Sequence, residues 1–67
     1  MQLEVIKLTI AQSRNLSRLA TIGPVTRSGG QFRDLSGNAV RGLHAPTVRR
    51  LVALGLVSIV NNYYLVN

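Results

Sequence analysis

Apolar residues recur at helical spacing in two stretches of the chain. The first stretch predicts a helix over 10–21, whose apolar face is formed by Leu16, Leu19 and Ala20. Thr9 and Gln12 have the spacing of a capping box, in which both side chains satisfy free backbone amides of the first turn. Gly23 and Pro24 should end this helix, because proline has no amide hydrogen with which to continue the hydrogen-bond ladder.

The second stretch predicts a helix over 46–54, whose apolar face is formed by Val48, Leu51 and Val52. Pro46 suits the first helical position, where the amide hydrogen that it lacks would have had no partner. The cap then falls to His44 or Ala45, neither of which is a strong capping residue. Gly55 suits the left-handed conformation just past the end of a helix.

Short apolar runs interrupted by turn residues predict strands in the rest of the chain. Turn clusters at 28–30 and 36–38 divide the segment 25–43 into two or three short strands. The segment 3–8 favours an extended chain, either as an edge strand or as a tail packed on the body.

The segment 57–66 predicts a hairpin that follows the second helix without a linker. Asn61 and Asn62 tolerate positive φ, so a two-residue turn would place Val60 opposite Tyr63. One face of this hairpin is apolar enough to meet the N-terminal segment or a second subunit, and it consists of Ser58, Val60, Tyr63 and Leu65. The order of elements therefore predicts an α+β fold.

Size and charge restrict the function classes. A chain of 67 residues predicts a single domain over 1–67, of modest stability, and a homodimer is compatible with this size. Eight Lys and Arg residues oppose two acids, Glu4 and Asp34, and give a formal net charge of +6. Arginine pairs with phosphates and carboxylates through its planar fork, so we expect an acidic partner, either nucleic acid or an acidic protein surface.

Several chemistries have little support in the residues. The chain has no cysteine and one histidine, His44, which argues against a metal site, and we expect no cofactor. No nucleophile motif accompanies the two acids, so we expect no enzymatic activity. The N-terminal residues do not resemble a signal peptide, and no apolar run approaches a membrane span of about 20 residues. We therefore expect a cytoplasmic protein without a membrane partner.

The segment 47–57 resembles the winged-helix pattern, in which a recognition helix ends in leucine-glycine-leucine-valine and enters the wing. A weaker similarity links the chain to YjhX-like small bacterial proteins proposed to act as toxins. The first resemblance implies a small winged-helix-like domain with a first helix, a short β-hairpin or meander, a second helix and a C-terminal β-hairpin. The family normally has a helix where 24–42 predicts strands.

The winged-helix resemblance also implies a small basic DNA-binding regulator of transcription. The residues that it assigns to the DNA groove are Thr47, Arg49 and Arg50. Phosphate contacts would come from Arg14, Arg18 and Arg41, and wing-tip contacts from Asn61 and Asn62. The alternative is a protein-binding inhibitor or phage-type effector that docks its arginine face on an acidic surface of a larger host protein. Any one arginine can also be a solvated side chain without a specific task.

Overall fold

The computed structural model describes residues 7–67. The prediction for 3–8 therefore falls largely outside the described residues, and Leu8 packs against the core without belonging to a strand. The described chain is a small α+β domain. Its elements in chain order are α1 (Ile10–Ile22), β1 (Val25–Ser28), β2 (Gln31–Asp34), β3 (Ala39–Val40), α2 (Ala45–Ala53), β4 (Val57–Val60) and β5 (Tyr63–Val66).

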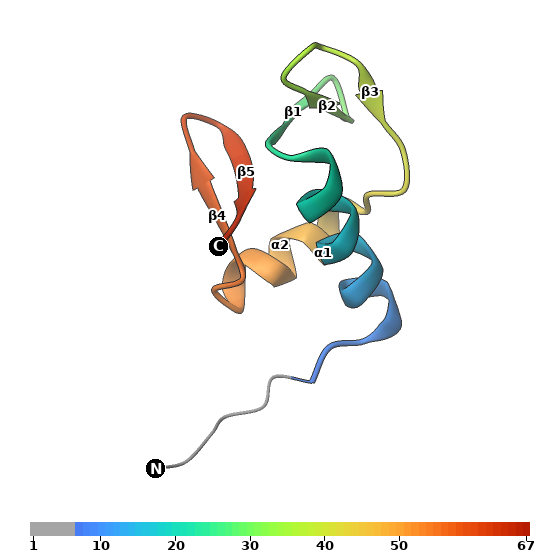
Figure 1. Cartoon of the computed structure of the whole chain (residues 1–67), viewed down its shortest axis with the longest axis vertical. Coiled ribbons are helices and arrows are strands. Elements are labelled where there is room, and N and C mark those ends of the chain that lie inside the picture. Colours follow the sequence, from blue (N-terminus) through green and yellow to red (C-terminus); the bar gives the residue numbers. More distant parts are fainter. Residues whose placement is uncertain (1–6) are drawn as a thin grey trace.

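One antiparallel sheet contains all five strands, in the order β3-β2-β1-β5-β4. The segment between the helices forms the meander β1-β2-β3, and the C-terminal hairpin β4-β5 joins it through β1 (Figure 1). The junction is short, since Val25 lies opposite Tyr64 and Thr26 opposite Tyr63. The sheet therefore consists of two locally formed units that meet along one pair of strands.

Helix α1 begins at the predicted capping box. The amide of Gln12 donates to Thr9 Oγ1 at 3.1 Å, and the Thr9 amide donates to Gln12 Oε1 at 3.0 Å. The helix ends at Gly23, which has φ +91° and donates its amide to the Leu19 carbonyl at 2.9 Å. These local signals are confirmed, because each acts within one turn of the residue that provides it.

The predicted apolar face of α1 is wrong at one position. Leu19 is buried and Leu16 packs against the core, but Ala20 is exposed and Asn15 is buried instead. Asn15 and Leu19 are four residues apart, so they lie above one another on one face of the helix, while Ala20 is rotated away from that face. The buried face is therefore centred one position earlier than the pattern of apolar residues indicates.

Helix α2 begins one residue before the predicted start, with His44 as the N-cap and no hydrogen bond from its side chain. Its end has the paired hydrogen bonds of a Schellman motif: Leu56 donates to the Leu51 carbonyl at 3.1 Å and Gly55 to the Val52 carbonyl at 3.0 Å. Gly55 has φ +79° there. Only three residues, 54–56, therefore separate α2 from β4.

The core lies between the two helices and the sheet, and consists of Leu19, Val25, Phe32, Val48, Leu51 and Val57. Phe32 from the meander contacts Tyr64 from the C-terminal hairpin edge to face, with ring centroids 5.9 Å apart. The predicted hairpin register is confirmed, with Val60 opposite Tyr63. Asn61 and Asn62 have φ +51° and +68°, as a type I′ turn requires. Among the described residues, no helix is long and apolar enough to span a membrane.

Candidate nucleic-acid interface

Helix α2 presents its two arginines to solvent. Val48 and Leu51 are fully buried on the inner face, whereas Arg49 and Arg50 are exposed. The side-chain hydrogen bonds that arginines make within the described residues come from Arg18 and Arg33, so no residue of 7–67 occupies the guanidinium groups of α2. Thr47, in the first turn, is half-buried. The buried face holds the helix in place, while the outer face carries two positive charges that no acid of residues 7–67 neutralises.

Arg18 and Arg41 come together where α1 meets the segment before α2. Arg18 Nε donates to the Arg41 carbonyl at 2.7 Å. Gly42 permits this approach, since it has φ +88° and a Cβ atom there would lie 3.2 Å from Arg18 Nε. Gly42 therefore lets the Arg18 side chain of α1 come close to the segment before α2. Arg14, one turn earlier on α1, is exposed like the other two.

Asn15 fixes the start of α2 against α1. Its side chain is only 5% exposed and its Oδ1 accepts the His44 amide at 2.8 Å, while its Nδ2 donates to the Ala11 carbonyl at 2.8 Å. The amide of the N-cap residue of α2 is thereby satisfied from another helix. The pattern of apolar residues did not reveal this role, and the available signal was an asparagine four residues before Leu19 on the apolar face.

The hairpin tip is exposed but does not project freely. The carbonyl of Asn62 accepts a hydrogen bond from Thr26 Oγ1 at 2.8 Å, which ties the tip to β1. Figure 1 shows the hairpin rising from the C-terminal end of α2, so Asn61 and Asn62 lie at the end remote from that helix. The structure therefore does not place the tip beside Thr47, at the start of α2.

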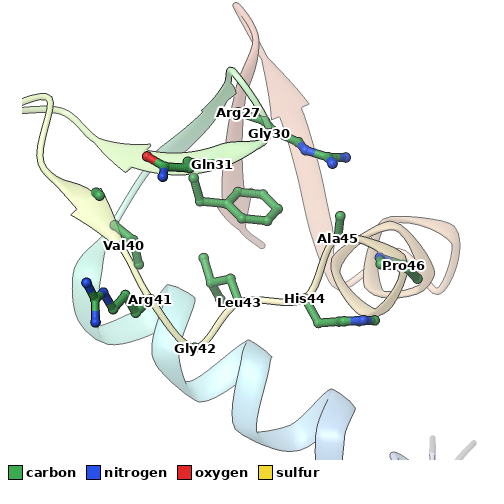
Figure 2. A pocket seen from close by; sticks show the side chains of 12 residues that line it. Arg27, Gly30, Gln31, Val40, Arg41, Gly42, Leu43, His44, Ala45 and Pro46 are labelled. Carbon is green, nitrogen blue, oxygen red and sulfur yellow. The ribbon is translucent and has the colours of Figure 1, made fainter.

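A groove of about 460 Å³ lies between the β1-β2 turn and the segment that leads into α2 (Figure 2). Its lining includes the apolar side chains of Phe32 and Leu43, and Arg27 and Arg41 lie on opposite sides of it. The Arg27 guanidinium is 5.9 Å from the centroid of the Phe32 ring, within reach of a cation–π interaction. Arg27 was absent from the predicted site, because its role depends on the pairing of β1 with β2.

The remaining charged groups of the meander are occupied locally. Arg33 donates to the Gly37 carbonyl at 2.9 Å and to Gln31 Oε1 at 3.3 Å. Asp34, the one acid in 7–67, accepts the amides of Ser36 and Asn38 at 3.0 and 2.9 Å. Its carboxylate is therefore committed to its own turn, and the charge of the exposed arginines is not balanced by acids of the described chain.

Within residues 7–67, no group of three or more His, Cys, Asp or Glu side chains is placed to hold a metal ion. His44 is exposed at the N-cap of α2. The chemistry that this surface supports is the binding of anionic groups by arginine.

Neither the protein-family models, nor the curated proteins, nor the solved structures contain a match to this chain.

Proposed function

We propose that this protein is a small regulator that binds duplex DNA through the outer face of α2. The observation that supports this most directly is the pair Arg49 and Arg50, exposed on a helix whose other face is buried in the core. An α-helix with its side chains is about 10–12 Å in diameter and the major groove is about 12 Å wide, so α2 can enter the groove with its outer face. Arginine can bind guanine through two hydrogen bonds or clamp a phosphate.

In this proposal Arg14, Arg18 and Arg41 contact phosphates beside the groove. They would hold the protein on the duplex without reading sequence. The meander β1-β2-β3 occupies the place of the helix that usually precedes a recognition helix. Asn15, rather than a neighbouring helix of that kind, then sets the position of the start of α2.

Titration of a fluorescent duplex at rising salt tests the proposal. If the five arginines on the helices and before α2 all contact phosphate, the slope of log K against log salt should be about −4.5. Arg49→Ala and Arg50→Ala should each weaken binding by about tenfold or more. Lys7→Ala is the control, because it removes one exposed positive charge outside α2. Equal losses for all three variants, or binding that is insensitive to salt, would refute a specific role for α2.

The groove favours a second candidate, an acidic protein partner. The phosphates of a nucleic-acid backbone would make no favourable contact with the apolar lining of this groove. An acidic peptide could place an apolar side chain over Phe32 and a carboxylate against Arg27 or Arg41. Two substitutions distinguish DNA binding from protein binding. Arg27→Ala should abolish a stoichiometric protein complex that survives nuclease treatment and leave DNA affinity unchanged, and Arg49→Ala should do the reverse.

A further inference from the structure

The strand β4 ends the sheet, and its outer edge has backbone groups without a partner strand among the described residues. In a hairpin with a two-residue turn, the pairs Val60–Tyr63 and Ser58–Leu65 exchange the backbone hydrogen bonds. The bond from the Asn67 amide to the Leu56 carbonyl, at 3.0 Å, continues this alternation. The amides and carbonyls of Val57 and Ile59 therefore point away from β5, toward the open edge.

The side chains of β4 do not protect this edge. Ile59 is 53% exposed and Val60 is 50% exposed, although both are large and apolar. Native edge strands are usually protected by lysine, proline, a bulge or a covering segment. The sequence Val-Ser-Ile-Val of β4 contains no lysine or proline, and its register with β5 runs without a bulge. Such an edge is suited to pairing with another strand.

The distribution of charge favours a second copy of this chain over an anionic ligand as the partner. Residues 51–67 contain no Asp, Glu, Lys or Arg, although the whole chain has a net charge of +6. Phosphates or an acidic peptide would find no cation on this hairpin. A second copy, in contrast, can bring its own uncharged hairpin to the edge while the arginines of both copies, all at or before Arg50, lie outside the paired strands.

We propose that two copies pair antiparallel through β4 about a two-fold axis at Ser58. Val57 then lies opposite Ile59 of the second copy, and Ile59 lies opposite Val57 of the second copy. Each outward amide of these residues donates a hydrogen bond to an outward carbonyl of the other copy. Because Val57 and Ile59 are on the same face, the pairing also covers the exposed Ile59 side chain beside the core of the other copy. The two five-stranded sheets become continuous. No arginine takes part, so this inference does not depend on DNA binding.

Sedimentation of the whole chain across a range of concentrations, combined with amide exchange, tests this pairing. Wild type should pass from monomer to dimer, and Ile59→Lys should raise the dissociation constant by about 100-fold, since a tenfold loss per copy enters twice. Ile10→Lys is the matched control: it places the same charge at a 74% exposed isoleucine on α1 and should leave dimerisation unchanged.

Amide exchange in the wild-type protein tests the pairing without a substitution, so the result does not depend on whether a variant folds. The Ile59 amide should exchange more slowly as the dimer forms, whereas the Ser58 amide, already bonded to β5, should be protected at every concentration. A chain that stays monomeric up to about 1 mM, where even a weak pair with Kd near 1 mM would be visible, overturns the proposal. A dimer in which the Ile59 amide remains unprotected, or which Ile59→Lys leaves intact, also overturns it.

Discussion

Replacing Asn15 should show how strongly one buried side chain positions α2. Asn15→Ala removes the acceptor at 2.8 Å from the His44 amide, and no other hydrogen bond of that amide is present among the described residues. It also removes the donor to the Ala11 carbonyl, which keeps its bond from the helix backbone. The main loss is therefore the link between α1 and the start of α2.

The expected cost follows from these contacts. Leaving a largely buried amide without an acceptor costs about 1–3 kcal/mol, and the higher helix propensity of alanine returns about 0.5 kcal/mol. We expect the free energy of unfolding to fall by about 1–2 kcal/mol. A domain of this size has a total of about 3–10 kcal/mol. The corresponding decrease in Tm is roughly 5–15 °C.

Urea denaturation followed by circular dichroism measures the loss. Ser13→Ala is the control, because Ser13 is exposed on the same helix and should change stability by less than about 0.5 kcal/mol. Amide exchange locates the effect: the His44 amide should lose protection in Asn15→Ala, while the Val48 amide, bonded to the His44 carbonyl at 2.9 Å, should keep it. Equal stability of Asn15→Ala and Ser13→Ala, or unchanged protection at His44, would refute the positioning role.

Two further substitutions test the backbone conformations on which the site depends. Gly42→Ala should destabilise the fold by about 1–2 kcal/mol or more in urea denaturation, because an L-residue is strained at φ +88° and its Cβ would press on Arg18. Gly37→Ala is the control, because Gly37 has a similar φ of +83° but no atom within 4 Å of the added Cβ. A smaller loss of stability in Gly37→Ala than in Gly42→Ala measures the contribution of the Arg18 contact, and equal losses would exclude that contribution. Asn62→Val should lower Tm, since a β-branched residue at φ +68° costs about 1–3 kcal/mol. Asn62→Gly suits the same turn, and a Tm loss in this variant as large as that of the valine variant would contradict the explanation by backbone conformation.

The exposure of Arg49 and Arg50 could be predicted from their neighbours. Val48 and Leu51 turn inward, and the intervening positions of a helix must then face outward. The same reasoning wrongly placed Ala20 on the buried face of α1, because a small apolar residue at the boundary of that face can be either buried or exposed. Arg27 could not be predicted as part of the groove, because the opposite wall is formed by residues 39–46, which lie at least 12 positions after Arg27 in the chain.

The features that could be read from the sequence alone are local. The capping box at Thr9, the glycine ending at Gly55 and the Asn61-Asn62 turn each act over a few residues, so their chemistry is readable without knowing the fold. Three further features emerge only from the folded structure: β1 joins β5, Asn15 holds the start of α2, and β4 is left as an edge. These arrangements depend on which faces of distant elements meet, and that outcome is set by the combined burial of side chains far apart in the chain.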